Sequence, residues 1–322
     1  MSLSHSLSLE VVLVQARLEA QGIVSYELRA PGNEALPAFT AGAHIDLYLP
    51  DGMTRSYSLA NDPGERQRYV IAVQLAEQGR GGSAWLHSTS RIGERLRISL
   101  PRNDFELVQD PGLAVFICGG IGITPALSMI HLRVRQGLPW RLLYAVRSHE
   151  RCAFVEELLD LEQRQGLGQV QFFRSDDDER LDMQRVITTT PADAHLYCCG
   201  PQRMINEFIA ATSSRPPTLV HYERFAAASE AATGGGFEVV LQRSGTRISV
   251  EAGKSILDAL LENGVDVQYA CSNGVCGTCR TGVLEGVPDH RDDYLTDDEK
   301  RGNTAVMVCC SGALSPRLVL DL

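Results

Sequence analysis

The sequence predicts three domains: an antiparallel β-barrel, an α/β domain built on a doubly wound parallel sheet, and a C-terminal β-grasp domain. Three observations lead to this prediction. Residues 1–105 contain many short strand-like segments between turn residues, residues 106–225 alternate strands with helices, and an alanine- and glycine-rich run at 226–236 precedes a cysteine-rich end. The length of 322 residues suits two or three domains.

Six segments of the first region have the composition of strands, because β-branched and aromatic residues gather between turn residues such as Gly42 and Gly93. They are residues 9–18, 22–29, 44–49, 54–59, 69–73 and 94–99. So many short strands in one stretch indicate a small antiparallel barrel, which we assign to residues 1–105.

Two short patches of this barrel have the chemistry of a ligand site. Arg55 and Tyr57 alternate along one strand, so both lie on one face, where a cation and an aromatic ring could meet a phosphate and a flat ring. Residues 79–83, Gly-Arg-Gly-Gly-Ser, offer backbone N–H groups, the start of a helix and the Ser83 hydroxyl to a phosphate. Taken singly, each patch is also typical of an ordinary strand or turn.

The region 106–225 has a different pattern. A continuous apolar strand at 114–118 begins a series in which strands alternate with helices. Further strands are expected at 141–146, 170–173 and 195–199, and helices at 126–136, 154–165, 181–187 and 202–211. This alternation implies a parallel sheet with helices on both faces.

Two turns of small residues lie where strands of this domain meet helices, on the same carboxyl edge of the predicted sheet. They contain Gly119, Gly120, Gly122, Cys199, Gly200 and Pro201. Open α/β sheets bind nucleotides at this edge, so we predict that these residues contact a nucleotide. The glycine spacing alone is a weak signal, because it lacks the full Gly-x-Gly-x-x-Gly fingerprint.

The run 226–236 has no residues that could form a packed face, so it is predicted to be a linker that leaves 237–322 as a separate domain. Strands are expected at 237–241 and 247–250, followed by a helix that Ser255 caps. Two strands, a helix and then a cysteine loop form a β-grasp pattern.

Three cysteines, Cys271, Cys276 and Cys279, follow the spacing Cys-x4-Cys-x2-Cys, and Cys309 lies downstream. This is the plant-type ligand spacing of a [2Fe–2S] cluster. Zinc sites usually pair two short spacings or include histidine, so a structural zinc site is the weaker alternative. Cys310 adjoins Cys309, and only one of the two is expected to face the cluster.

Composition and charge narrow the function further. The net charge of −10 disfavours nucleic acid as a partner and permits docking to a basic protein surface. No apolar run has the length of a membrane span, so we expect no membrane association, and residues 1–7 lack the features of a secretory signal. Nine cysteines without export favour thiols and metal ligands over disulfides, as in a cytoplasmic protein.

Together these features resemble the phthalate dioxygenase reductase family, the FMN-containing branch of the ferredoxin–NADP reductase superfamily. The resemblance covers essentially the whole chain, in the order flavin domain, nicotinamide domain and ferredoxin domain. The motifs that carry it are Arg55-x-Tyr57-Ser58-Leu59, Gly79-Arg-Gly-Gly-Ser83, Gly119-Gly-Ile-Gly-Ile-Thr-Pro125, Tyr197-Cys-Cys-Gly-Pro201, His221-Tyr-Glu-Arg-Phe225 and the four cysteines.

The resemblance implies a role for each motif. Thr124 would lie near the flavin and the nicotinamide, Cys199 near the transferring carbon, and Phe225 would cover the flavin ring. The two barrel patches would hold FMN through Arg55, Tyr57, Ser58, Arg80, Gly81, Gly82 and Ser83. The cluster ligands would be Cys271, Cys276, Cys279 and Cys309.

The implied protein is an NADH-dependent oxidoreductase that passes electrons from NADH to FMN, to the [2Fe–2S] cluster and to a Rieske-type oxygenase. NADH gives two electrons and the cluster accepts one, so a flavin is needed between them. We expect NADH because Asp176 follows a strand end where a carboxylate accepts the ribose hydroxyls and repels a 2′-phosphate, although Arg174 and Arg180 could favour NADPH. The alternatives are a similar reductase for a haem or di-iron monooxygenase and, more remotely, a zinc-binding module.

Overall fold

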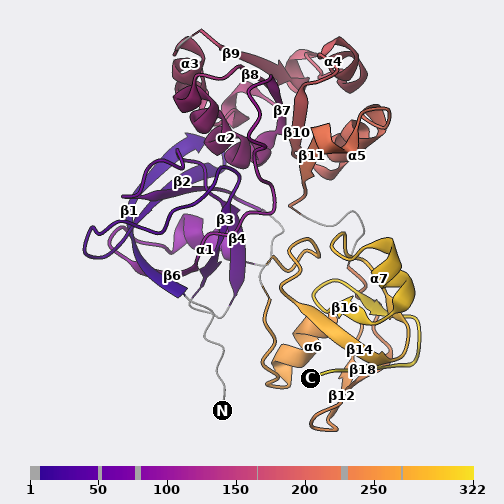
Figure 1. Cartoon of the computed structure of the whole chain (residues 1–322). Coiled ribbons are helices and arrows are strands. Elements are labelled where there is room, and N and C mark those ends of the chain that lie inside the picture. Colours follow the sequence, from indigo (N-terminus) through magenta and orange to yellow (C-terminus); the bar gives the residue numbers. More distant parts are fainter. Residues whose placement is uncertain (1–7, 50–52, 77–80, 165, 226–230, 270) are drawn as a thin grey trace. The chain divides into compact units, whose positions relative to one another are not determined.

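The fold was analysed in a computed structural model of the whole chain (Figure 1). It describes residues 8–49, 53–76, 81–164, 166–225, 231–269 and 271–322. The chain divides into two compact units, Met1–Glu223 and Arg224–Leu322, and each unit is described by itself. The finer boundaries expected at residues 105, 225 and 236 stay predictions.

Six antiparallel strands and one short helix form the barrel of the first unit (Figure 1). They are β1 Ser8–Ala20, β2 Ile23–Arg29, β3 His44–Tyr48, β4 Thr54–Ser58, β5 Tyr69–Gln74, α1 Gly82–Ser88 and β6 Arg95–Ser99. The strand order is β4-β3-β6-β1-β2-β5. A bridge between Leu59 and Ile71 joins the ends of this series and closes the sheet, so the predicted barrel is confirmed.

The inside of the barrel is filled by side chains that alternate along the strands, as the pleat requires. Val11 and Leu13 of β1 are buried with Ile45 and Leu47 of β3, and none of the four is more than 1% exposed. A rigid apolar interior of this kind stabilises β4, the strand that carries the predicted flavin patch.

The second half of the first unit is a five-stranded parallel sheet with helices between its strands. Its elements are β7 Ala114–Gly119, α2 Ile123–Gln136, β8 Trp140–Val146, α3 Val155–Gln163, β9 Gly168–Arg174, α4 Met183–Thr189, β10 His195–Cys199, α5 Gln202–Ala211 and β11 Val220–Glu223. The order β11-β10-β7-β8-β9 confirms the doubly wound sheet. The chain winds first to one side of β7 and then to the other, so its direction reverses between β7 and β10.

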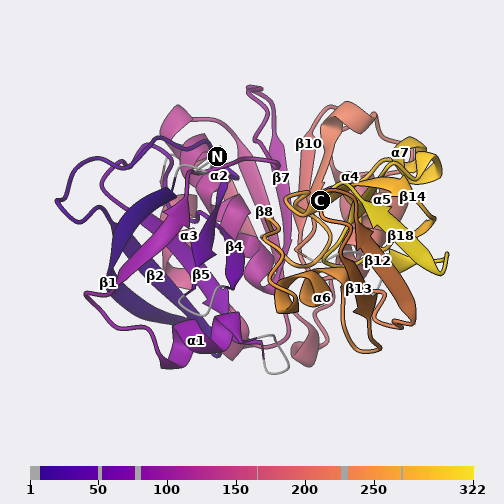
Figure 2. The ribbon, with the colours of Figure 1, turned by 90° about the horizontal axis from the view of Figure 1, so that it is seen from below.

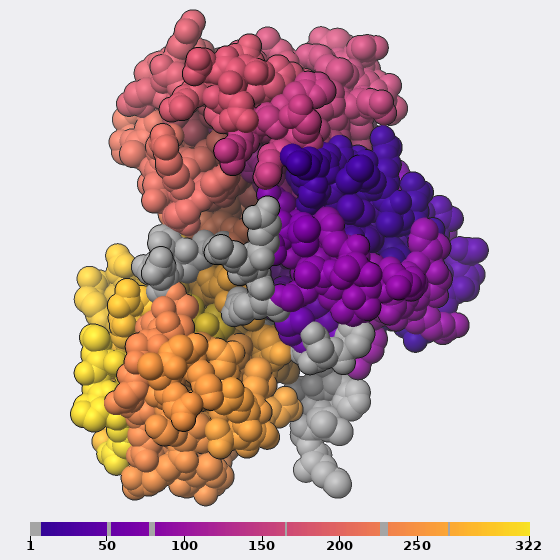
Figure 3. Space-filling view, turned by 180° about the vertical axis from the view of Figure 1, so that it is seen from behind, coloured from indigo at the N-terminus to yellow at the C-terminus, as the bar shows by residue number. Residues whose placement is uncertain are grey.

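Alternate residues of β7 face two different helix layers. Phe116 and Cys118 belong to a core that includes α2, α3 and residues of the barrel, whereas Val115 and Ile117 pack with α4 and α5. The helices α2 and α3 therefore lie on the barrel side of the sheet (Figure 1). In the space-filling view, the barrel and the α/β half share one continuous surface (Figure 3).

The second unit has two small sheets and two helices. Its elements are β12 Phe237–Leu241, β13 Arg247–Val250, α6 Ile256–Glu262, β14 Arg280–Glu285, β15 Pro288–Asp289, α7 Asp297–Gly302, β16 Ala305–Met307, β17 Gly312–Ala313 and β18 Arg317–Leu320. The main sheet has the order β13-β12-β18-β14-β16. Helix α6 lies beside β12 and β13 (Figure 2), as expected for a β-grasp domain.

The predicted cap of α6 is confirmed. Ser255 accepts a hydrogen bond from Asp258 N–H, and the Asp258 carboxylate accepts one from Ser255 N–H, which makes a capping box. The apolar face of the helix, including Ile256 and Leu260, then packs into the core of the second unit. In the part of the chain that the structure describes, no helix is long and apolar enough to cross a bilayer.

Candidate functional site

The two predicted nucleotide turns meet at the switch point of the parallel sheet. Strands β7 and β10 are neighbours, and Cys118 pairs in register with Cys199. A Cβ atom on Gly122 would lie 2.3 Å from the Cys199 carbonyl oxygen, and one on Gly119 would lie 2.6 Å from Cδ of Pro201. Glycine is therefore required at both positions because the two strand ends pack so closely.

Gly120 has a different environment from the other two glycines. Its φ is +54°, and a Cβ atom there would meet nothing within 4 Å, so one side of the turn faces open space. The Gly120 carbonyl accepts a hydrogen bond from the Tyr144 hydroxyl at 3.0 Å, and Thr124 donates to the Ile121 carbonyl at 3.0 Å. These two buried hydroxyls fix the protein-facing side of the turn. The backbone on the open side, at Gly120, can therefore approach a ligand closely.

Glu223, at the end of β11, is a site residue to which the sequence assigned no role. Its carboxyl Oε2 lies 3.9 Å from Cys199 Sγ. Burial and the nearby Asp104 raise the pKa of Glu223 to about 8. Burial and Glu223 also raise the pKa of the Cys199 thiol well above its usual value. Both groups are therefore mostly protonated and uncharged at neutral pH.

Glu223 lies within the motif at 221–225 that the sequence analysis identified. Its contact with Cys199 could not be predicted, because that contact depends on the register between β10 and β11. Cys199 pairs with Glu223 only because β10 and β11 are parallel neighbours. Phe225, the second residue of the second unit, is 37% exposed, and its place over a flavin stays a prediction.

Asp176 lies after β9, at the outer edge of the sheet. Its side chain is 54% exposed, and its carboxylate lies 3.7 Å from Nε of Arg147. Arg174 lies 3.5 Å from the Glu179 carboxylate. Arg147 and Arg174 therefore each face a carboxylate, in partly exposed pairs that contribute little to stability.

The structure brings the two barrel patches together. The side chain of Arg55 on β4 covers Gly82 at the start of α1, where a Cβ atom would lie 2.7 Å from Cγ of Arg55. Gly81 has a φ of +90°, a conformation that favours glycine. Burial raises the pKa of Tyr57 to about 12. A cation, a half-buried phenol and a glycine turn thus lie in one place, as a flavin phosphate site requires.

Three further residues of the predicted FMN set are Ser58, Arg80 and Ser83. Ser83 Oγ accepts a hydrogen bond from Ala76 N–H at 3.1 Å, so this hydroxyl can offer only its proton to a phosphate. Ser58 is buried at the end of β4. Arg80, and Gly79 before it, lie outside the described residues, so the prediction for Arg80 stays as it was made.

In the second unit, the cysteine loop turns its backbone N–H groups toward sulfur. Asn273 N–H donates to Cys271 Sγ at 3.3 Å, and Cys271 N–H lies 3.5 Å from Cys276 Sγ. Ser272 and Gly274 have φ values of +54° and +74°, which make these approaches possible. Such donors stabilise thiolate ligands, so the loop fits the group that its spacing predicts.

The remaining cysteines complete the set. The Cys271 thiol lies beside the thiols of Cys276 and Cys309, which favours Cys309 as the fourth ligand, and Cys279 is 4% exposed. Among the described residues, no three His, Cys, Asp or Glu side chains converge as ligands of one metal ion.

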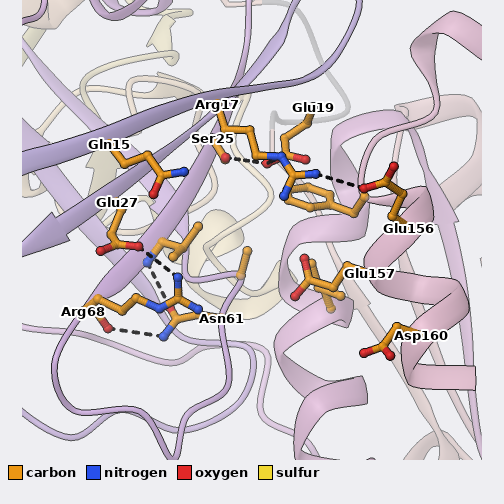
Figure 4. Close-up of a pocket in the computed structure, with 14 residues that line it drawn as sticks. Gln15, Arg17, Glu19, Ser25, Glu27, Asn61, Arg68, Glu156, Glu157 and Asp160 are labelled. Atoms are coloured by element: carbon orange, nitrogen blue, oxygen red, sulfur yellow. Dashed lines mark hydrogen bonds and ion pairs between the residues drawn. The ribbon is translucent and has the colours of Figure 1, made fainter. Parts of the chain in front are cut away.

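A further cavity of about 430 Å³ lies in the first unit, between the barrel and α3 (Figure 4). Two arginines that line it are paired: Arg68 lies between Glu27 and Glu65, and Arg17 reaches Glu156 at 3.4 Å. None of the predicted site residues lines it. We interpret the cavity as part of the polar interface between the barrel and α3.

Comparison with known proteins agrees with this geometry. Residues 239–314 match the 2Fe-2S iron-sulfur cluster binding domain, and residues 116–209 match the oxidoreductase NAD-binding domain. The chain is 47% identical over 303 residues to phenoxybenzoate dioxygenase subunit beta of Ectopseudomonas oleovorans, covering 94% of each chain. It is 41% identical over 305 residues to phthalate dioxygenase reductase of Burkholderia cepacia, covering 94% of each.

Similarity extends to a solved structure. The structure titled "Phthalate dioxygenase reductase: a modular structure for electron transfer from pyridine nucleotides to [2Fe-2S]" superposes with a TM-score of 0.82 at 39% identity, over 98% of both chains. The chain belongs to the phthalate dioxygenase reductase family. It is therefore an oxidoreductase, and the predicted cofactors, FMN, NADH and a [2Fe–2S] cluster, are confirmed.

Proposed function

We propose that this member of the phthalate dioxygenase reductase family is the NADH-dependent reductase component of a Rieske-type oxygenase system. The observation that carries the proposal is the pairing, in one chain, of a nicotinamide fold with a plant-type cysteine loop. Each bound group supplies redox chemistry: NADH gives electrons in pairs, the cluster accepts them singly, and FMN exchanges electrons with both. The protein binds these groups, orients them and excludes water.

The flavin site is proposed at the meeting point of β4 and α1. Arg55 supplies a permanent positive charge for the FMN phosphate, and Tyr57 a half-buried aromatic ring. The glycine turn brings backbone N–H groups close without side-chain obstruction. The complete proposed set is Arg55, Tyr57, Ser58, Arg80, Gly81, Gly82 and Ser83.

The nicotinamide site is proposed at the carboxyl ends of β7 and β10. The turns at 119–122 and 199–201 form its floor, with Thr124 beneath the first turn and Cys199 at the end of the second strand. Neutral Glu223 beside Cys199 leaves this floor without a negative charge against the electron-rich ring. Phe225 is proposed to cover the flavin ring until nicotinamide arrives.

NADH is proposed as the donor rather than NADPH. Asp176 presents a half-exposed carboxylate to the adenosine ribose, where it can accept two hydroxyl hydrogen bonds. Arg174 is engaged with Glu179, so it is less available to a 2′-phosphate. Both features favour the cofactor that lacks the phosphate.

The electron outlet is the second unit, with Cys271, Cys276, Cys279 and Cys309 as the proposed ligands. Residues 237–322 carry 13 Asp and Glu against 8 Lys and Arg, so the module is acidic and suited to a basic docking surface on the oxygenase. We place the protein in the cytoplasm, where NADH is available and thiols stay reduced.

Anaerobic titration of the purified protein with NADH and then NADPH tests this proposal. We expect flavin and cluster absorbance to bleach with NADH, and far more slowly with NADPH. Reconstitution should then sustain turnover of a Rieske-type oxygenase and not of a cytochrome P450 or di-iron monooxygenase. Protein without flavin and [2Fe–2S] bands, or preference for NADPH, would contradict the assignment.

A further inference from the structure

The carboxylate of Asp292 is fully buried in the second unit, where its side chain is 0% exposed. Moving a carboxylate out of water is costly, so it needs hydrogen-bond donors around it. Oδ2 of Asp292 accepts from Leu295 N–H at 2.8 Å and from Tyr294 N–H at 3.2 Å. The carboxylate therefore fixes the turn that follows it, and the buried Leu295 side chain anchors this turn in the core of the unit.

The turn after Asp292 packs on the cysteine loop at two points. Asp293 N–H donates a hydrogen bond to the Gly274 carbonyl at 3.0 Å. The Tyr294 ring lies against Gly277, where a Cβ atom would come within 2.2 Å of the ring atom Cζ. Because the proposed ligand Cys276 lies between these two glycines in sequence, the turn supports the loop on both sides of it.

The other oxygen of the same carboxylate reaches a second segment. Oδ1 of Asp292 accepts a hydrogen bond from the Ser311 hydroxyl at 3.4 Å. Ser311 is 0% exposed and follows Cys309 by two residues, and its N–H donates to the Met307 carbonyl at 3.0 Å. One carboxylate thus binds two segments that are distant in sequence, and each segment holds or directly supports proposed ligands.

Two basic side chains lie near the carboxylate at longer distances. Lys300 Nζ is 3.9 Å from Oδ2 of Asp292, and it also donates a hydrogen bond to the Asp292 backbone carbonyl. His290 Nδ1 is 3.8 Å from Oδ1. These distances are too long for hydrogen bonds to the carboxylate, so its position is set by the backbone N–H groups and the Ser311 hydroxyl.

We propose that Asp292 is a positioning residue for the [2Fe–2S] cluster, because its carboxylate ties the cysteine loop to the segment that carries Cys309 and so slows the loss of iron. The cluster site is complete only while both segments stay in place. Residues that orient metal ligands without touching the metal commonly control metal retention in this way. The inference rests on the proposed function, because it requires ligands from both segments: Cys271, Cys276, Cys279 and Cys309.

The test compares Asp292→Ala with Asp292→Asn in the full-length protein carrying flavin and cluster. Two properties are measured: the rate at which an excess of a coloured iron(II) chelator takes iron from the reduced protein, and the g values of the reduced cluster in electron paramagnetic resonance. We expect Asp292→Ala to lose iron about 10- to 100-fold faster than the wild type, with shifted g values. Asp292→Asn should stay near the wild type in both, because its amide oxygen accepts from both N–H groups and its NH2 group donates to Ser311.

Two further variants separate positioning from general stability. Asp258→Ala is the matched control, because it removes a carboxylate that accepts two hydrogen bonds from Ser255 in the cap of α6. It should lower the thermal midpoint and leave the rate of iron loss and the g values near those of the wild type. Ser311→Ala removes the contact to Oδ1 alone, so its rate of iron loss should lie between those of the wild type and Asp292→Ala. It decides the case if Asp292→Ala does not fold.

Three results would overturn the inference. Wild-type rates of iron loss in Asp292→Ala or in Ser311→Ala would show that the carboxylate does not hold the two segments together. Equal acceleration in Asp292→Ala and Asp258→Ala would assign the effect to a less stable unit. Equal acceleration in the alanine and asparagine variants would assign it to the lost charge and not to the hydrogen bonds. Wild-type protein without iron would instead refute the proposed function itself.

Discussion

The turn after β7 and the cysteine loop are built from the same residues, glycine and cysteine, for different reasons. In the turn, Gly119 and Gly122 are needed because neighbouring chain would collide with any side chain. In the loop, Gly274 and Gly277 have φ values of +74° and +75°, so the backbone conformation itself favours glycine. Close packing alone explains Gly119 and Gly122, whereas Gly277 combines a positive φ with the close approach of the Tyr294 ring, 2.2 Å from where a Cβ would lie.

The cysteines differ in a similar way. Cys199 lies in a strand with its thiol beside a carboxyl, and burial and Glu223 together keep it protonated. Cys271 receives a backbone N–H donor at 3.3 Å and lies beside two further thiols. The comparison shows that surrounding donors, more than the presence of cysteine, distinguish a metal ligand from a buried thiol.

The strongest test of this contrast is to remove a cysteine from each region. We expect Cys276→Ala to lose the cluster, so iron falls from about two per chain to a small remainder. Cys199→Ala should keep the full iron content, since it has no sulfur-directed donors and lies in the nicotinamide half. Iron analysis of both proteins checks this, and equal iron in the two variants would break the distinction.

The glycines can be tested within the first turn. We expect Gly122→Ala to destabilise the first unit by about 3 kcal/mol, because its Cβ would meet the backbone oxygen of Cys199 at 2.3 Å. Gly120→Ala should cost only about 1 kcal/mol, the penalty for a left-handed alanine in open space. Denaturant unfolding measures both, and a larger loss at 120 would contradict the packing explanation.

The raised pKa of Glu223 makes the free energy of unfolding of the first unit depend on pH. Its pKa is about 8 in the folded protein, against an ordinary value of 4.5, so the folded state retains a proton that the unfolded state releases. This group therefore lowers stability as pH rises from 4.5 to 8, by up to about 1.4 kcal/mol per pH unit.

The variant Glu223→Gln cannot ionise, so its thermal midpoint should exceed that of the wild type by a margin that grows from pH 5 to pH 8. Thermal scans across this range measure the difference. A margin that is constant with pH would show that the carboxyl ionises normally in the folded protein.

The smallest expected effect comes from removing the Tyr144 hydroxyl, which supports the turn after β7. Tyr144→Phe removes the hydroxyl that donates to the Gly120 carbonyl, and we expect the KM for NADH to rise about 2- to 10-fold while kcat changes little. Tyr197→Phe is a matched control, because it loses a hydrogen bond to Val108 N–H away from this turn. Equal KM changes in the two variants would assign the effect to general loosening.

The sequence predicted elements whose signals are local. Strand alternation and the cap at Ser255 depend on residues near one another in the chain, and the structure confirms both. The cysteine spacing is also a local signal, and the ligand role that it assigns to these cysteines stays a prediction. The helix expected from residue 154 begins at Val155, because Phe154 has a φ of +62° and so is not helical. Bulky residues rarely adopt a positive φ, so the sequence could not predict this boundary. Boundaries of this kind depend on tertiary packing.

Contacts across the fold could not be predicted in the same way. The pairing of Cys199 with Glu223 depends on which strands are neighbours, and Arg224 forms an ion pair with Asp293, 3.5 Å away within the second unit. The sequence named Ser83 as a phosphate ligand but could not show that Ala76 N–H already uses its oxygen. Each of these partners is distant in sequence or lies across a turn.

The central claim is that this chain converts paired electrons from NADH into single electrons at the cluster, with FMN as the necessary intermediate carrier. The most direct measurement is electron paramagnetic resonance of the reduced cluster after anaerobic addition of NADH to protein with and without FMN. The account predicts the reduced-cluster signal in FMN-loaded protein and its absence after FMN removal, although dithionite should still reduce the cluster. Equal signals with NADH in the two samples would contradict the account.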